Sequence, residues 1–379
     1  SGNGVGRKAG TEVYDTGRET YGCHALSFAA SSADVTMMAM TAMKYAQCLI
    51  WLTMLGAAVL AQAPAVEKVE PPNWWAGHSV GTVRLLVRGS GFRDAAVRSA
   101  NPELTVANVR VNGTGTYVFF DVRIAPAARA GKYRFELTAD GGKVQVPFEI
   151  SPLAKAPQTI TNDDVIYLIM TDRFADGDAS NNKNVDRSNP RMWHGGDLRG
   201  VINNLGYIKE LGATAIWLTP WYDNADEVTT CDKPWCPMAS YHEYGAIDYY
   251  SVENHFGTMA DLTELVQKAN SMGIKVIQDQ VANHVGFRHP WMKQAPLDNW
   301  FTPFKQNKFN NSSLLSPNAS PADVGNTLKG WFDFSLPDLD QEEPEVARYE
   351  IQNALWWIGM TGISGIRQDT IQYMPRKFI

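Results

Sequence analysis

Short apolar runs separated by turn residues fill residues 64–152. The runs are rich in β-branched and aromatic side chains, and turns such as Asn112-Gly113 lie between them. They cover residues 82–87, 104–111, 116–124, 132–138 and 143–150. Short strands at this spacing are typical of a β-sandwich. We therefore expect an all-β domain over 64–152.

From residue 165 onward the pattern changes, and apolar runs alternate with amphipathic segments. Strands are expected at 165–170, 214–218, 274–279 and 362–370, and helices at 200–211, 258–272 and about 345–360. Thr258 and Asp261 have the spacing of a helix-capping pair. Parallel strands joined by crossover helices form either an α/β barrel or a doubly wound sheet. Four strands are expected here, whereas a closed barrel has eight.

The first 63 residues differ from both of these regions in composition and hydrophobic pattern. Residues 1–42 show no steady apolar period, and we expect them to be disordered or translated upstream of the true start. Residues 43–63 combine Met43-Lys44, an apolar run over 48–60 and a final Ala-Gln-Ala. This run is shorter than the ~20 residues of a membrane span, and the pattern favours a signal peptide over a buried helix. The prediction is a secreted or periplasmic protein, with no membrane attachment after cleavage.

Charge and cysteine content narrow the function classes. The net charge is −6 and there is no dense run of Lys or Arg, which argues against nucleic acid and anionic membranes as partners. Among the four cysteines no pair has the spacing of a zinc site. Cys231 and Cys236 share one loop, where either a small disulfide or two free thiols would fit.

Candidate chemistry lies in the last predicted strand, within Gly365-Ile366-Arg367-Gln368-Asp369. Side chains alternate along a strand, so Arg367 and Asp369 share one face. A guanidinium beside a carboxylate favours its ionised form, which suits a nucleophile and not a general acid. A purely structural ion pair is the alternative for an isolated pair of this kind.

A second polar group follows the third predicted strand, in Asp279-x-Val281-x-Asn283-His284. Together with the Gly-x-Arg-x-Asp stretch at 365–369, it resembles the motifs of the α-amylase superfamily, whose members are barrel glycosidases with retaining chemistry. The resemblance covers about residues 160–379. The segment 64–152, with Trp74 and Trp75, resembles the N-terminal domain of cyclomaltodextrinases and neopullulanases.

The resemblance implies a multidomain fold, in which a β-sandwich is followed by a TIM-type α/β barrel. Residues 153–379 would form about the first half of that barrel, with a long insertion over about 285–344 after the third strand. The two adjacent tryptophans would either pack in the domain or stack on a sugar.

The resemblance also assigns roles at the reacting centre. Asp369 would be the nucleophile, Arg367 would hold it ionised and oriented, and Asp279 would orient Arg367. Tyr244 would stack on the sugar ring at the cleaved bond.

Three further residues would bind or brace the substrate, namely His242, Asn283 and His284. In the family the general acid is a Glu after the fifth strand, and the sequence stops at Ile379, before that strand.

These roles imply an exported, retaining α-glucan hydrolase acting on α-1,4-linked oligosaccharides, cyclodextrins or pullulan. One alternative is a transglycosylase on the same scaffold. A non-catalytic carbohydrate-binding remnant and a barrel-derived interaction protein are the others. Related enzymes also form homodimers, so a homodimer is a further expectation.

A calcium site is expected in the loop after the first barrel strand. Its carboxylate, amide and carbonyl oxygens are the hard ligands that Ca²⁺ prefers. Similar loops bind calcium in neopullulanase-like enzymes, and the alternative is a solvated Asp/Asn turn. The candidate ligands are Asp176, Asp178, Asn181, Asn182, Gly195 and Asp197.

Overall fold

A computed structural model describes residues 62–153, 156–230, 232, 234, 236–304 and 316–379. The expectations for residues 1–42, and for almost all of 43–63, lie outside the described residues and stay predictions. Within the described ranges no helix has both the length and the apolar character needed to cross a membrane.

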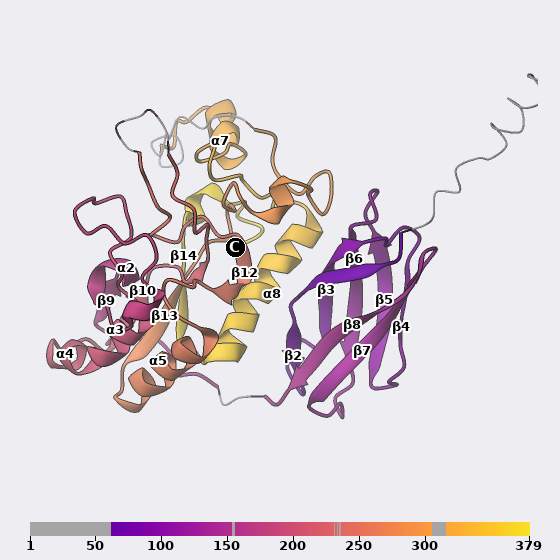
Figure 1. The fold of residues 1–379 in the computed structure, drawn as a ribbon, viewed down its shortest axis with the longest axis horizontal. Helices are drawn as coiled ribbons and strands as arrows, with labels where there is room; N and C mark the ends of the chain where they lie inside the picture. The colour runs from indigo at the N-terminus through magenta and orange to yellow at the C-terminus, as the bar shows by residue number, and fades with distance from the viewer. Residues whose placement is uncertain (1–61, 154–155, 231, 233, 235, 305–315) are drawn as a thin grey trace, which may run out of the picture. The chain divides into compact units, whose positions relative to one another are not determined.

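Two four-stranded sheets make up the predicted β-sandwich (Figure 1). One sheet has the order β1 (Ala65–Glu70), β3 (Thr82–Ser90), β6 (Tyr117–Ile124) and β5 (Leu104–Val111). The other has the order β2 (Asn73–Trp75), β8 (Gly142–Ser151), β7 (Gly131–Ala139) and β4 (Ala96–Ser99). Trp74 and Trp75 are 0% and 3% exposed, so they pack in the core and do not present a sugar-stacking surface.

A parallel sheet carries the second part of the chain, as Figure 1 shows. Its order is β14 (Gly365–Gln368), β13 (Lys275–Gln280), β10 (Ala215–Leu218) and β9 (Ile166–Ile169). The four strands match the four predicted ones, and the prediction of a sandwich followed by part of a barrel is confirmed. Because the strands are parallel, their carboxyl ends lie at one edge, where barrel enzymes place their chemistry.

Helices connect and extend these strands. They are α2 (Thr171–Phe174), α3 (Leu198–Asn203), α4 (Leu205–Glu210), α5 (Met259–Ser271), α7 (Pro321–Leu328) and α8 (Pro344–Thr361). Short 3₁₀ turns are η1 (Ala179–Asn181), η2 (Pro290–Met292) and η3 (Ile371–Tyr373). The predicted cap of α5 is present, because Thr258 and Asp261 each accept a hydrogen bond from the backbone N–H of the other.

Three local predictions need correction. The single helix expected over 200–211 is interrupted at Asn204, whose side-chain amide donates to the carbonyl of Gly200 at 2.8 Å. The insertion after β13 contains α7, which its Asn- and Pro-rich composition did not indicate. The antiparallel pair β11 (Tyr222–Asp223) and β12 (Asp248–Val252) was also missed, because its two strands are short and far apart in sequence.

Candidate active site

The candidate nucleophile and its neighbours meet at the carboxyl edge of the parallel sheet. Asp279 on β13 and Arg367 on β14 are direct register partners. Asp369 follows β14 immediately, and its backbone N–H donates to the carbonyl of Gln280 at 2.8 Å. Backbone pairing between β13 and β14 therefore positions all three charged residues independently of their side-chain contacts.

One guanidinium nitrogen links the two carboxylates. Arg367 Nη1 donates to Asp279 Oδ1 at 2.8 Å and Oδ2 at 3.1 Å, and to Asp369 Oδ1 at 2.8 Å. The Asp279 side chain is fully buried, whereas those of Arg367 and Asp369 are 36% and 13% exposed. The expected contact between Arg367 and Asp369 is present, and the second oxygen of Asp369 is left out of this pairing.

Asp279 is enclosed by donors. Trp217 Nε1 and the Tyr244 hydroxyl each donate to its Oδ2 at 2.9 Å, in addition to the bonds from Arg367. Burial raises the pKa of Asp279, and Arg367 is the main group that opposes this rise. With both oxygens occupied, Asp279 is suited to hold Arg367 in place, as expected, and not to transfer a proton.

Trp217 is a site residue for which the sequence predicted no role. Its indole donates to Asp279, and the guanidinium carbon of Arg367 lies 4.8 Å from its ring centroid. The available signal was its position near the end of β10, at the same edge of the sheet as the two carboxylates.

His284 and Asn283, the two residues predicted to brace the sugar site, lie next to Tyr244. His284 Nε2 is 3.0 Å from the Tyr244 carbonyl oxygen, and Asn283 Nδ2 is 3.3 Å from His284 Nδ1. His284 and Asn283 are each only 1% exposed. Their contacts support the position of Tyr244 from within the protein, which fits the bracing half of their predicted role.

Asp338 is the second residue that the sequence reasoning missed. Its Oδ1 accepts from Asn283 Nδ2 at 3.0 Å and its Oδ2 accepts from Thr302 at 2.7 Å. Burial raises its pKa to about 8. Nothing in the local sequence of the insertion announces this contact, because its partners come from distant segments.

His242 also contacts Tyr244. Its Nδ1 accepts from the Tyr244 backbone N–H at 3.2 Å, and the two rings are 5.7 Å apart. Burial, with smaller contributions from His284 and Arg173, lowers the pKa of His242 to about 4. The neutral imidazole is therefore the form that the folded protein favours.

This shift predicts an acid-sensitive contribution to stability. His242 has a lower pKa when folded than its ordinary ~6.5, so its contribution is complete above about pH 6.5 and is lost as the pH falls towards 4. The loss should reach about 2–3 kcal/mol. Denaturant unfolding at pH 4–7 measures it. His242→Asn, which keeps an acceptor for the Tyr244 N–H, should flatten the profile by that amount, and an unchanged profile would contradict the assignment.

The predicted calcium ligands come together around one loop. Asn181 Nδ2 lies 3.3 Å from Asp197 Oδ2, and Asn182 Nδ2 donates to Asp176 Oδ2 at 2.7 Å. The backbone N–H of Asp178 donates to Asp197 Oδ2 at 2.8 Å.

The backbone of Gly195 approaches Asn182 of this loop closely. Its φ is +83°, and a Cβ placed there would come within 2.4 Å of Asn182 Oδ1. The side-chain oxygens of Asn181 and Asn182 are both buried without a hydrogen-bond partner. Buried polar atoms are normally satisfied, so these two oxygens are available as hard ligands for a cation.

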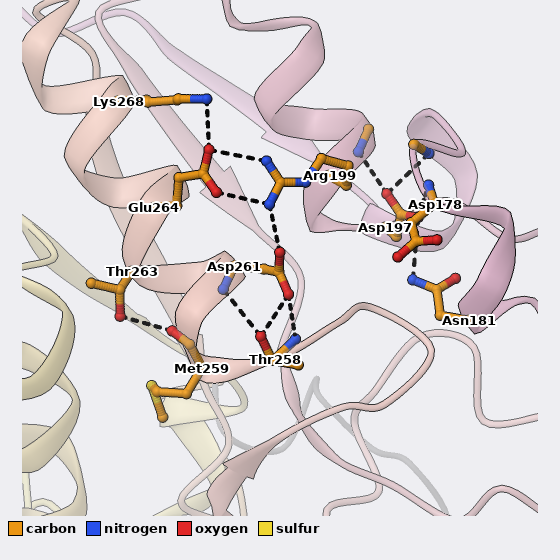
Figure 2. Close-up of polar contacts among 12 residues, drawn as sticks. Asp178, Asn181, Asp197, Arg199, Thr258, Met259, Asp261, Thr263, Glu264 and Lys268 are labelled. Carbon is orange, nitrogen blue, oxygen red and sulfur yellow. Dashed lines mark hydrogen bonds and ion pairs between the residues drawn. The ribbon is translucent and has the colours of Figure 1, made fainter.

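Figure 2 shows how this loop is anchored to the helices. Asp197 caps α3, accepting from the backbone N–H of Gly200 at 2.6 Å. Arg199, on the same helix, donates to Asp261 at 2.6 Å and to Glu264 at 2.7 and 3.0 Å, both on α5. The carboxylate of Asp197 is thus fixed at the start of α3, and Arg199 in turn ties α3 to α5.

Gly200 has no room for a side chain, since an added Cβ would lie 1.8 Å from the carbonyl oxygen of Ala175. We expect Gly200→Ala to lower the free energy of unfolding by about 2–3 kcal/mol, despite the better helix propensity of alanine. Gly206→Ala in α4 is the matched control, because its Cβ would meet nothing within 4 Å. It should be neutral or stabilising by up to about 1 kcal/mol. Urea unfolding of both variants compares them, and equal effects would contradict this packing.

Two protein families match the chain. The one described as "Alpha amylase, catalytic domain" matches residues 168–378, and "Cyclomaltodextrinase, N-terminal" matches residues 68–152. The chain belongs to the α-amylase family. Both resemblances inferred from the sequence motifs are confirmed.

Several relatives show the range of this family. A β/α-amylase of Paenibacillus polymyxa is 38% identical over 223 residues, covering 56% of this chain and 17% of that protein. A cyclomaltodextrinase of Thermoanaerobacter pseudethanolicus is 31% identical over 234 residues, covering 58% and 36%. The structure of an Anoxybacillus α-amylase is 42% identical, covers 57% and 42%, and has a TM-score of 0.49. The chain spans less than half the length of each of these relatives.

Proposed function

We propose that the protein is a retaining α-glucan hydrolase with Asp369 as its nucleophile. The observation that carries the proposal is the single guanidinium of Arg367, bonded to both Asp279 and Asp369 at the carboxyl edge of the sheet. Family membership supports a substrate of α-linked glucose, and the substrates we propose are α-1,4-linked oligosaccharides, cyclodextrins or pullulan.

In the proposed reaction an oxygen of Asp369 attacks the anomeric carbon of the bound sugar. The bond from that carbon to the leaving oxygen breaks, and a general acid supplies the proton that the leaving sugar takes away. Water then displaces Asp369 and gives its proton back to the same acid–base group, so the product keeps its anomeric configuration. Arg367 donates a hydrogen bond to Asp369 and orients it for both steps.

The general acid needs a second carboxyl about 5–5.5 Å from the nucleophile. Asp279 does not fit this role, because both of its oxygens accept hydrogen bonds from Arg367, Trp217 or Tyr244. We assign the acid to no residue of this sequence.

Hydrolysis is favoured over glycosyl transfer by the match of residues 68–152 to the cyclomaltodextrinase N-terminal family. Relatives named cyclomaltodextrin glucanotransferase are also similar to this chain, so transfer is the competing outcome. Incubation with α-maltotriosyl fluoride, whose leaving fluoride needs no proton from an acid, followed by NMR of the first products, tests the proposal. Linear products in the α configuration are expected. Products of the β configuration, or transfer products alone, would contradict it.

We also propose that the loop over 176–182 binds Ca²⁺ together with Gly195 and Asp197. The support is the pair of unpartnered amide oxygens and the set of hard oxygen ligands around them. The ion would tie the loop to the start of α3, and we route no chemical step through it.

Chelation therefore has a predicted effect on stability. Ca²⁺ at about 100 times its dissociation constant adds ~2.7 kcal/mol, so EDTA should lower the Tm by about 5 °C. Differential scanning fluorimetry with EDTA and with added Ca²⁺ measures this change. Asn182→Ala should remove most of the response, whereas Asn203→Ala on the exposed end of α3 should leave it intact. A Tm that responds to neither EDTA nor Ca²⁺ would contradict the site.

Export is proposed on the signal-peptide pattern at 43–63. Cys236 is disulfide-bonded, which supports an oxidising compartment, while Cys231 lies outside the described residues. A mature protein beginning at Pro64 is the expected result of intact-mass analysis, and a different first residue would contradict the cleavage site. A homodimer stays a prediction, which light scattering can test.

A further inference from the structure

A second group of acidic side chains lies outside the proposed reacting centre. Glu253, which follows β12, is 0% exposed. Its Oε1 lies 2.7 Å from His255 Nδ1, and its Oε2 accepts from the backbone N–H of Asn224 at 2.9 Å. Asp226 Oδ1 is 3.7 Å from the same His255 nitrogen. Potential ligand atoms of Asp226, Glu253 and His255 all lie within 4.8 Å of one another.

Glu243 adds a carboxylate that has no partner. It is 0% exposed, and neither side-chain oxygen has a hydrogen bond. Its carboxyl lies close to that of Glu253. In the described part of the chain no Lys or Arg forms an ion pair with Glu243 or Glu253. A buried carboxylate without a cation costs several kcal/mol, so its retention needs a physical reason.

The backbone at Glu243 makes this burial more unusual. Its φ is +63°, in the left-handed region where glycine is favoured. A glutamate here combines strain in the main chain with an unsatisfied buried side chain. Such combinations persist where a ligand or a functional constraint compensates for them.

His255 is held in one orientation. Its ring stacks on that of Trp193, with centroids 3.9 Å apart and an interplanar angle of 6°. Its Nδ1 faces Glu253 and Asp226, and its Nε2 is buried without a partner among the described residues. A fixed imidazole beside buried carboxylates is a usual arrangement for a metal ligand.

We propose that Glu243, Glu253, His255 and Asp226 form a binding site for a divalent transition-metal ion, of which Zn²⁺ is the best-fitting example. Imidazole nitrogen combined with carboxylate oxygen suits Zn²⁺, whereas Ca²⁺ takes oxygen ligands only. Ligands about 2.1 Å from one ion are at most about 4.2 Å apart. The ligand atoms of Asp226, Glu253 and His255 lie within 4.8 Å of one another, so these three groups need to close by less than about 1 Å.

This site differs from the proposed calcium loop in residues and in chemistry. It joins the segment that holds Glu243, next to Tyr244, to the segment that leads from β12 into α5. An ion there would fix the segment bearing the aromatic ring of the proposed sugar site. The inference does not depend on the hydrolase proposal, because its test measures metal binding and not turnover.

The test uses the full chain, freed of metal with a chelator and then dialysed into excess Ca²⁺ to fill the oxygen-only loop. Zn²⁺ is titrated by calorimetry, and Co²⁺ serves as a spectroscopic probe of the same site. We expect one Zn²⁺ per chain, visible Co²⁺ absorption bands that Zn²⁺ abolishes, and a Tm rise of about 3–6 °C at ~100 times the dissociation constant.

Two variants locate the ion. Glu243→Gly should fold well, because glycine accepts φ +63° and the buried carboxylate is removed. Zn²⁺ affinity should fall at least about tenfold in Glu243→Gly and in Glu253→Gln, and stay within about twofold in Asp178→Asn. Absence of Zn²⁺ binding to the parent chain would overturn the proposal. Binding that both Glu variants retain would also overturn it.

Discussion

Replacing Asp369 with asparagine should lower the turnover of α-maltosyl fluoride by at least about 10³-fold, because the amide cannot attack the anomeric carbon. Fluoride leaves without protonation, so this substrate reports on the nucleophile independently of the general acid. Release of fluoride, followed with an ion-selective electrode, measures the effect. The folded state should change little, because the bond from Arg367 to Oδ1 can be kept by the asparagine carbonyl oxygen.

Gln368→Leu is the matched control for this experiment. Gln368 is the immediate neighbour of Asp369, but its side chain donates to the backbone carbonyls of Gln280 and Asp369 and not to the reacting carboxylate. Its turnover should stay within about threefold of the parent. Turnover of Asp369→Asn within tenfold of the parent would contradict the assigned nucleophile.

Loss of the guanidinium should have the second-largest effect. We expect Arg367→Met to lower the free energy of unfolding by about 2–3 kcal/mol, because the fully buried Asp279 loses its cation. Turnover of α-maltosyl fluoride should fall by about 10²-fold or more, since Asp369 is no longer oriented. Arg367→Lys should recover much of the stability but less of the activity, because all three bonds come from one nitrogen that an ammonium replaces without the same geometry.

Arg348→Met provides the comparison for a surface pair. Arg348 Nη1 lies 2.9 Å from Asp121 Oδ1, and its own side chain is 51% exposed. Asp121 is buried, but it keeps its contacts with Arg84 and Asn108 when Arg348 is removed. Exposed ion pairs contribute about 0–1 kcal/mol, so this variant should be close to the parent in urea unfolding. Equal losses in the free energy of unfolding for Arg367→Met and Arg348→Met would contradict the predicted cost of leaving the buried Asp279 without a cation.

The reacting residues could be predicted because their relation is local or follows from strand order. Arg367 and Asp369 are two residues apart in a strand, so alternation alone places them on one face. Asp279 joins them because it lies near the end of the neighbouring parallel strand and is the register partner of Arg367. The cap of α5 could be predicted for the same reason, since Thr258 and Asp261 are three residues apart.

The rest of the site depends on contacts between distant segments. Trp217 and Asp338 acquire their roles from hydrogen bonds to Asp279 and Asn283, which no local pattern contains. Glu243 appears in the sequence as an ordinary glutamate in a loop. Its full burial, its left-handed backbone and its position against Glu253 emerge only when the chain is folded.

Covalent trapping tests the central assignment most directly. The protein is incubated with a maltosyl fluoride that carries a second fluorine at C5 of the reacting ring, which slows release of the covalent intermediate, and its peptides are then sequenced by mass spectrometry. The proposed mechanism predicts one sugar-modified peptide with the added mass on Asp369. Label on a different carboxylate, or turnover of the reagent with no covalent label, would contradict it.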